Sequence, residues 1–415
     1  MGLIFDSSLV AQVVNVTLKN ITGTTTTSDG ATSDGLIVTE DLGNIVQAGQ
    51  TIVNGLTVDN FKNQVTGMFE TVGKIYFETL SADGYDSDIF NLRVDSAEFA
   101  CLIEKVRIND KDFEASFVLD GSSNSTFTDL FAKHPFSFNV KVWGNKGFYR
   151  TKPFTISYEM YKTSVQSESG WRELVARMWS VIDAIVDIAI SESPWFVVRQ
   201  QIANCALYRG GIRVINLPSE YETETGETYT DATDPKFAKW FVKYQRHIKK
   251  LLRKATNKFS GKSTLKMNTP SVYERSFLID TFYDDINNGL SGVYHDDKIG
   301  NIDDYDLVPY VQNVNEPRKL DIVPANPPVL NAGYHVTGVT FENVVGMIWD
   351  KRGTFFSLEY KKVADNYNPF DDHINYISTV GAQHCVDEDS NAIVFTLSTD
   401  ESGIDYDIDE DEDSE

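Results

Sequence analysis

The 415-residue chain has little of what small-molecule chemistry usually requires. Its three cysteines, Cys101, Cys205 and Cys385, are far apart and odd in number, which excludes a disulfide framework and a zinc cluster. None of its six histidines is spaced as His-x-x-x-His, and no Gly-x-Ser-x-Gly elbow occurs. We therefore expect no metal, no cofactor and no catalytic residue.

Long apolar runs are also lacking. The nearest approach to a membrane span is Val181–Ile190, which Asp183 and Asp187 interrupt, whereas a span needs about 20 apolar residues. The start of the chain, Met1-Gly2, lacks the basic region of a signal peptide. With 41% apolar residues, the sequence predicts sizeable cores and no membrane contact.

Positive charge is scarce, because the formal net charge is -24. Residues 400–415 hold ten acids and no base, and without them 51 acids face 37 bases, a net of -14. Residues 236–266, in contrast, carry eleven bases and no acid. A strongly acidic chain repels nucleic acid and anionic membranes, so the basic segment is the feature to explain.

Two segments resemble ligand-binding motifs, but each lacks a glycine that the motif requires. Ser260–Thr264 resembles a phosphate-binding loop, but Thr256 stands where that loop needs glycine for close backbone approach. Asp405–Asp411 resembles the first half of a calcium loop, but its sixth position is Glu410 instead of glycine. The first is predicted to be a flexible connector, and the second is expected to bind cations weakly and diffusely at most.

The first 160 residues are predicted to hold few helices. Residues 1–54 are predicted to be an extended arm, because Gly23–Gly35 is low-complexity and cannot bury a core. A short helix is predicted over Asp59–Val72 from its apolar spacing. After it, five β-rich pieces predict a long hairpin: Ile75–Phe77, Ala100–Ile103, Phe113–Leu119, Phe136–Trp143 and Phe154–Tyr158.

The longest helical pattern starts after Ser169, a reasonable N-cap. An apolar stripe runs from Leu174 to Ile188, and the pattern resumes through Leu207 before Gly210-Gly211. Pro194 is expected to kink or restart the helix. The two pieces cover about 40 residues, or roughly 60 Å, which is long for a compact enzyme.

A polar loop is predicted over 218–234, and Pro235 then opens an amphipathic helix. Its apolar stripe is Phe237, Phe241, Tyr244, Ile248 and Leu251, and its basic face is Lys236, Lys239, Lys243, Arg246, Lys250 and Arg253. Such a face can bind phosphate backbone, or can be solvated or paired with acids on a neighbour. Strands are predicted over Ser276–Ile279, Leu307–Val311, Val344–Trp349 and Ala392–Leu397, and a helix over Phe282–Leu290.

The order of these parts is similar to an α+β fold, that of the major capsid protein of tailed phages, named after phage Hong Kong 97. More closely, it resembles the shell proteins of small short-tailed phages (podoviruses) of Gram-positive bacteria. The segments that carry the likeness are Asn145–Tyr149 before the long helix, Ser276–Thr281, Val345–Arg352, Asn366–Phe370, Gly381 and Ala392–Phe395.

The resemblance implies a layout of six segments. They are an N-terminal arm (1–58), an extended loop and its base (59–165), the spine helix of a peripheral domain (166–217), an axial domain (218–335), a return to the peripheral and axial core (336–398) and an acidic tail (399–415). In the extended loop, Phe113, Phe117, Val118 and Leu119 would form an apolar patch that a neighbouring subunit covers.

The resemblance also implies a function without catalysis. The chain would assemble with itself, as hexamers and pentamers, into an icosahedral or prolate virion shell in the host cytoplasm. Scaffold, portal and minor capsid proteins are possible partners, and packaged double-stranded DNA would make weak, non-specific contacts. The alternatives are another virion protein (portal, tail or decoration) and a glycan hydrolase, which would need paired carboxylates in one cleft.

Overall fold

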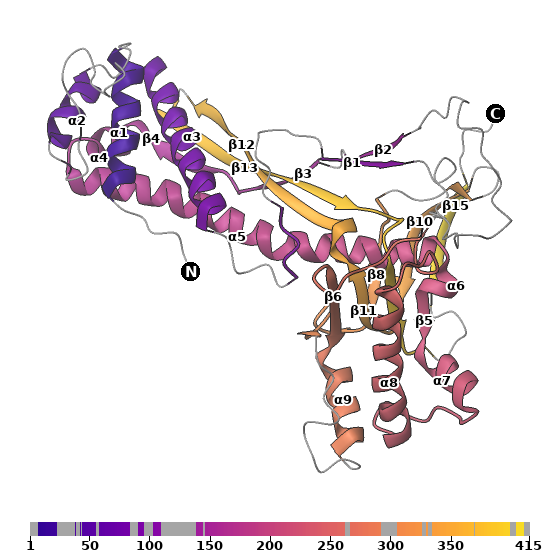
Figure 1. Ribbon diagram of the computed structural model, residues 1–415. Helices are drawn as coiled ribbons and strands as arrows, with labels where there is room; N and C mark the ends of the chain where they lie inside the picture. Colours follow the sequence, from indigo (N-terminus) through magenta and orange to yellow (C-terminus); the bar gives the residue numbers. More distant parts are fainter. Residues whose placement is uncertain are drawn as a thin grey trace, which may run out of the picture. The chain divides into compact units, whose positions relative to one another are not determined.

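The computed structural model has an α+β fold (Figure 1). It describes residues 7–22, 38, 42, 44–54, 58–83, 90–94, 103–108, 138–143, 146–261, 266–291, 305–325, 329–330, 334–368, 370–398 and 404–410. The chain divides into two compact units. Unit 1 comprises 1–101, 145–193 and 356–384, and unit 2 comprises 102–144, 194–355 and 385–415.

Unit 1 contains a group of N-terminal helices: α1 (Ser7–Thr22), α2 (Ile45–Asn54), α3 (Val58–Asp83) and α4 (Tyr158–Ser164). Helix α1 packs against α2 and α3, with Val10, Val13 and Val14 wholly buried. The prediction of an extended, coreless arm is therefore wrong for α1 and α2. The apolar residues of α1 are buried by packing on α2 and α3, so this segment does contribute to a core.

Helix α3 confirms the helix predicted over Asp59–Val72 and continues to Asp83. The strand predicted over Ile75–Phe77 is wrong, because these residues lie inside this helix. The buried side chains Val65, Phe69, Val72 and Tyr76 recur at helical spacing, so one stripe extends through the predicted boundary. The Tyr76 hydroxyl donates to Asp183 Oδ1 at 2.6 Å.

The sheet of unit 1 is built on the long strand β13 (His373–Val386), which pairs with β12 (Thr354–Asn368). Strands β3 (Lys146–Arg150) and β4 (Phe154–Ser157) pair antiparallel with β13, in the registers Val380↔Tyr149 and Ile374↔Ile156. The strand predicted over Phe154–Tyr158 is confirmed, apart from Tyr158, which begins α4.

In unit 2, β1 (Ile103–Ile108) and β2 (Phe138–Trp143) form an antiparallel pair with Ile103 opposite Trp143. Strand β2 confirms the strand predicted over Phe136–Trp143, whereas β1 shares only Ile103 with the strand predicted over Ala100–Ile103. The proposed interface residues Phe113, Phe117, Val118 and Leu119 lie outside the described residues.

Helix α5 (Glu168–Leu207) is 40 residues long and runs through Pro194 without a break. The expected restart at Pro194 is therefore wrong, although the proline still removes the N–H that would bond to the carbonyl of Ile190. The N-terminal cap is Ser167 instead of Ser169, since the Ser167 hydroxyl accepts from the Gly170 N–H at 3.1 Å. The boundary between the units, 193/194, falls inside this helix.

The main sheet of unit 2 has the order β5-β14-β11-β6-β7. Its strands are β5 (Val214–Asn216), β14 (Ala392–Thr396), β11 (Val344–Asp350), β6 (Glu274–Ile279) and β7 (Asp306–Val308). The strands predicted near residues 276, 344 and 392 are confirmed, and β7 ends before Pro309. Every residue of β11 is buried, which explains its continuous apolar run.

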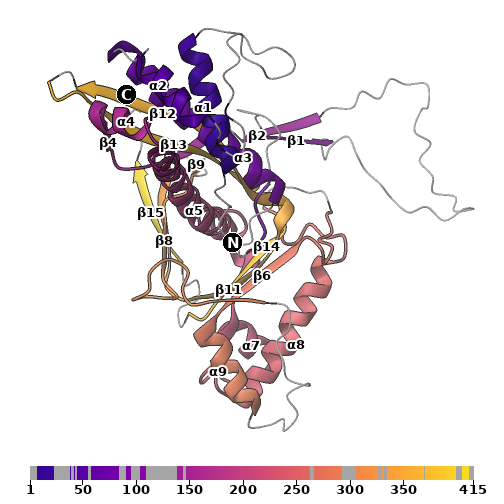
Figure 2. The same ribbon diagram turned by 90° about the vertical axis from the view of Figure 1, so that its left-hand side faces the viewer.

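Helices α7 (Leu217–Thr225), α8 (Pro235–Leu252) and α9 (Asp280–Ser291) gather together in unit 2, and α8 contacts α9 (Figures 1 and 2). Helices α8 and α9 confirm the two helices predicted there. The loop predicted over 218–234 is wrong in its first half, where α7 lies. This helix has proline at its start and ends at Gly226, whose φ of 69° is left-handed.

A second sheet of unit 2 has the order β15-β10-β8, and β9 also pairs with β10. The strands are β8 (Leu320–Ile322), β9 (Val329–Leu330), β10 (Tyr334–Phe341) and β15 (Ile404–Glu410). Part of the acidic tail is therefore a strand. Its Tyr406 hydroxyl donates to the carbonyl of Ala206 at 3.2 Å.

Candidate functional site: the basic face of helix α8

Helix α8 is fixed in unit 2 by its cap and by its apolar stripe. The Asp234 carboxylate accepts from the Lys236 N–H at 3.0 Å, and Pro235 occupies the first turn. The predicted stripe residues Phe237, Phe241, Tyr244 and Ile248 are buried, with Leu252 in the place expected for Leu251. This packing leaves the opposite face of the helix exposed to solvent.

The six predicted bases of α8 are all exposed, but they do not share one environment. Two of them form ion pairs with carboxylates outside α8: Lys236 Nζ lies 2.7 Å from Glu227 Oε1, and Arg253 Nε lies 3.5 Å from Glu274 Oε2. The other four, Lys239, Lys243, Arg246 and Lys250, follow one another at steps of four, three and four residues. That spacing places them on one side of the helix.

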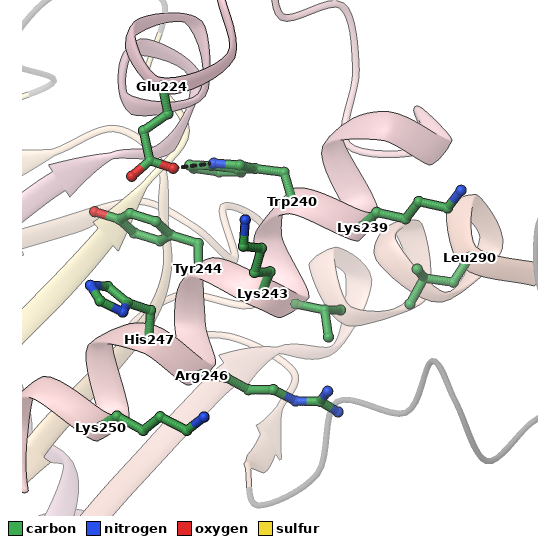
Figure 3. Close-up of a pocket in the computed structure, with 10 residues that line it drawn as sticks. Glu224, Lys239, Trp240, Lys243, Tyr244, Arg246, His247, Lys250 and Leu290 are labelled. Atoms are coloured by element: carbon green, nitrogen blue, oxygen red, sulfur yellow. Dashed lines mark hydrogen bonds between the residues drawn. The ribbon is translucent and has the colours of Figure 1, made fainter.

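These four bases line an open pocket of about 740 Å³, which we call the α8 groove (Figure 3). Its other lining residues are Glu224, Trp240, Val242, Tyr244, His247 and Leu290. Glu224 is the one carboxylate among the ten residues that line it. The groove is therefore suited to an anionic partner.

The aromatic wall of the groove is held by carboxylates of α7. Trp240 Nε1 donates to Glu224 Oε2 at 2.7 Å, and the Tyr244 hydroxyl donates to Glu220 Oε1 at 3.2 Å. Burial and the neighbouring Glu220 raise the pKa of Tyr244. Since the polar atoms of the wall have partners, the cationic side chains determine what the groove attracts.

The buried ion pair of Lys249 was not predicted from the sequence, because only the bases expected to be exposed on α8 were considered. Lys249 is buried, its Nζ lies 3.6 Å from Glu274 Oε1 and 3.3 Å from the Ser276 hydroxyl, and it stands 4.0 Å over the Tyr305 ring. The available signal was its position: Lys249 falls on the apolar side of the helix, next to Ile248. A lysine there needs a buried partner.

The sheet β8-β10-β15 carries an opposite charge on one side. Thr340 of β10 pairs with Asp321 of β8 and with Asp405 of β15, so these three side chains form one row. Asp407 follows opposite Gly338, where any larger side chain would collide with its carboxylate. The three aspartates are exposed, and we call this surface the acidic sheet face.

Unit 1 contains a polar cluster that resembles part of a catalytic site. The Ser193 hydroxyl lies 3.1 Å from His384 Nε2 and 3.1 Å from the Tyr149 hydroxyl. Burial lowers the pKa of His384 to about 4, so the imidazole is neutral near pH 7. Because Ser193 is wholly buried, its hydroxyl cannot meet a substrate, and the cluster is structural.

Within the described ranges, no group of three or more His, Cys, Asp or Glu side chains is placed to hold a metal ion. Cys205 and Cys385 are buried, and burial raises the pKa of both thiols, that of Cys385 to about 12. Cys101 and Lys262 lie outside the described residues. Gly261 approaches the backbone of Glu388 and donates to its carbonyl at 3.1 Å, which explains a glycine there without a phosphate.

Among the helices that the structure describes, none is both long and apolar enough to cross a membrane. The 40 residues of α5 satisfy the length but not the apolar requirement, because charged side chains recur along it.

Comparison with known proteins gives structural similarity only. No protein-family model and no curated protein matches the chain. A chain of the Staphylococcus phage Andhra capsid is similar at 10% identity and a TM-score of 0.40, covering 75% of this chain and 84% of that one. A chain from the structure of the head fiber and inner core protein gp22 of bacteriophage P68 is similar at 12% identity and 0.42, covering 74% and 83%. A chain of the virus-like particle of Pyrococcus furiosus is similar at 8% identity and 0.32, covering 79% and 98%.

Proposed function

We propose that the chain is a major capsid protein of a tailed phage: a structural subunit, not an enzyme, that assembles with itself into the shell around the genome. We rest the proposal on the chain's own elements, because the structural similarities all have TM-scores below 0.5. The observation that carries it is α5, a helix of 40 residues that belongs to both compact units.

The shared elements have a physical meaning. Strand β13 also crosses the division, at 384/385, so both a helix and a strand continue from one unit into the other. A helix as long as α5 is suited to the spine of a shell subunit. A compact enzyme of this size has no comparable need for a helix of roughly 60 Å.

The proposed layout assigns the helix over 166–217 to the spine and residues 218–335 to most of the axial domain. Strands β11 and β14 come from 336–398 and lie in the same sheet as β6 and β7, which suits a return of the chain to a shared core. Residues 1–58 would be the arm, 59–165 the extended loop with its base, and 399–415 the acidic tail.

We further propose that the partners are other copies of the chain, in hexamers and pentamers, with scaffold, portal and minor capsid proteins during assembly. Packaged double-stranded DNA would touch the shell weakly, since a net charge of -24 opposes phosphate binding. The place of action would be the virion shell, after assembly in the host cytoplasm.

The alternative of a glycan hydrolase finds little support. Such an enzyme needs two carboxylates in one cleft, at about 5 to 10 Å from each other. The α8 groove has a single carboxylate, Glu224, and that carboxylate accepts a hydrogen bond from Trp240. A portal, tail or decoration role has no specific observation in its favour.

Electron microscopy of the purified protein tests the proposal directly. The full chain should form closed shells or rings in negative stain, alone or with the scaffold protein of its phage. Sedimentation should show particles far larger than the 46.6 kDa chain. A chain that stays monomeric at every concentration and salt tested, with and without scaffold, would contradict the function.

A further inference from the structure

We infer that the α8 groove of one copy binds the acidic sheet face of a second copy. The inference rests on the proposed self-assembly and deepens it, because it names the surfaces through which neighbouring copies meet. The occupant of the groove is thus another copy of this chain, bound by its aspartates.

The groove has cationic side chains available for such a contact. Lys243 and Lys250 are exposed, and no ion pair or hydrogen bond from either is found among the described residues. Figure 3 shows Arg246 and Lys250 extending in the same direction from α8. With Lys243 they line the α8 groove, an open concavity of about 740 Å³.

The acidic sheet face carries exposed carboxylates, of which Asp321 accepts from the Thr340 hydroxyl at 2.8 Å. Asp321 and Asp405 flank Thr340 on adjacent strands, so their Cα atoms are separated by two strand spacings, about 10 Å. The screening length at physiological salt is about 8 Å, so exposed charges at that distance repel one another only weakly. Lys319, which directly precedes β8, lies 3.7 Å from Glu342.

Among the described residues of one copy, the two surfaces do not pair with each other. The ion pairs of the described residues include none between α8 and the strands β8 or β15. Both surfaces belong to unit 2, so they are carried on one compact body. Two different, complementary surfaces on one body produce a head-to-tail contact, which closes into a ring when the rotation between copies allows it.

Nucleic acid would also meet a basic groove, but the proposed self-assembly and the acidic sheet face on the same chain favour a second copy. The net charge of -24 opposes the approach of both, so it does not decide between them. Every copy of the chain carries one acidic sheet face for each α8 groove. Asp321 and Asp405 are spaced across the sheet, and Asp405 and Asp407 along β15, which suits lysines spaced along a helix.

Two charge-reversed chains test the contact. The groove variant carries Lys243→Glu and Lys250→Glu, and the face variant carries Asp321→Lys and Asp405→Lys. Each alone presents like charges across the contact, so its self-association constant should fall roughly tenfold or more. An equimolar mixture of the two variants should recover association, because each then finds a complementary surface. One chain with all four substitutions should recover it as well.

The matched control, Lys74→Glu with Lys254→Glu, changes the charge by the same amount at two exposed positions outside the groove. Sedimentation velocity and electron microscopy give the readouts, with circular dichroism to show that each chain is folded. The inference is overturned if the groove variant associates as well as this control. It is also overturned if neither the mixture nor the four-fold variant recovers association.

A third outcome also overturns it and identifies nucleic acid as the occupant: normal particles from the groove variant that retain less DNA. The proposed function fails separately. Wild-type chains could associate through these surfaces, with recovery in the mixture, but never form rings or shells. That result would support the inferred contact and contradict the proposed function as a shell subunit. Wild-type chains that do not associate at all would contradict both.

Discussion

In unit 1, the buried polar side chains that the structure describes are neutral, whereas in unit 2 six of them carry charge. The neutral set is Thr17, Gln64, Ser193, Ser357, Ser378 and Gln383, and the charged set is Arg213, Lys249, Glu274, Asp350, Asp387 and Asp389. A buried charge must be paired or hydrogen-bonded, so its neighbours are fixed more strictly than those of a buried hydroxyl or amide. Unit 2 should therefore tolerate polar substitutions less well than unit 1.

Arg213 is the extreme case, since its side chain is fully buried. Its guanidinium donates to the carbonyls of Ala392, Asn204, Glu388 and Ser390 at 3.1–3.3 Å. These bonds hold the loop before β14 against the end of α5. The loop also donates from the Asp387 N–H to the Gly353 carbonyl at 2.7 Å.

The largest effect is expected from Arg213→Ala. It leaves four carbonyls without their donor and should lower the free energy of unfolding of unit 2 by about 3–5 kcal/mol. Denaturant unfolding measures the loss, and hydrogen exchange in β14 assigns it to unit 2. Arg177→Ala, an exposed residue of α5 paired with Glu173, is the control and should cost less than about 1 kcal/mol. Equal losses in the two variants would contradict the comparison.

The next effect concerns Lys249, whose neighbour in sequence, Lys250, provides a matched control. Lys249→Met leaves Glu274 buried with only the half-exposed Arg253 nearby and should cost about 3 kcal/mol. Lys250→Met should change stability by less than about 0.5 kcal/mol. The double variant Lys249→Met with Glu274→Gln should recover much of the loss, which a double-mutant cycle measures. Additive losses would show that the pair is not coupled.

An effect of similar size, but dependent on pH, is expected in unit 1. The pKa of His384 is about 4 in the folded chain and about 6.5 when unfolded, so the unfolded state takes up the proton first as the pH falls. The stabilisation is complete above pH 6.5 and is lost towards pH 4, up to about 3 kcal/mol in total. His384→Gln should flatten the unfolding free energy over this window, relative to wild type. Parallel profiles would contradict the assignment.

Several of these features could not be predicted from the sequence for physical reasons. The helices α5 and α8 were predictable, because their stripes and their Ser and Pro starts are local signals. The partners of Lys249, Arg213 and His384 stand 25, 179 and 191 residues away, so only folding brings them together. In β15, the alternation of Ile404, Tyr406 and Ile408 was a strand signal, but the run of acids led to the prediction of an acidic tail without a strand.

The smallest effect is expected where a neutral hydrogen bond of unit 1 is removed without leaving a buried group unsatisfied. Tyr149→Phe deletes the hydroxyl that lies 3.1 Å from the Ser193 hydroxyl, but Ser193 keeps His384 Nε2 as a partner. The loss should therefore be about 1 kcal/mol, the net contribution of an ordinary hydrogen bond. Tyr158→Phe is the control in the same unit: its ring packs on Phe61 at 5.4 Å, and its hydroxyl has no hydrogen bond among the described residues. Denaturant unfolding at pH 7.5, where His384 is neutral, compares the two. A loss from Tyr149→Phe as large as that from Arg213→Ala would mean that unit 1 depends on its neutral cluster as strictly as unit 2 depends on its buried charges.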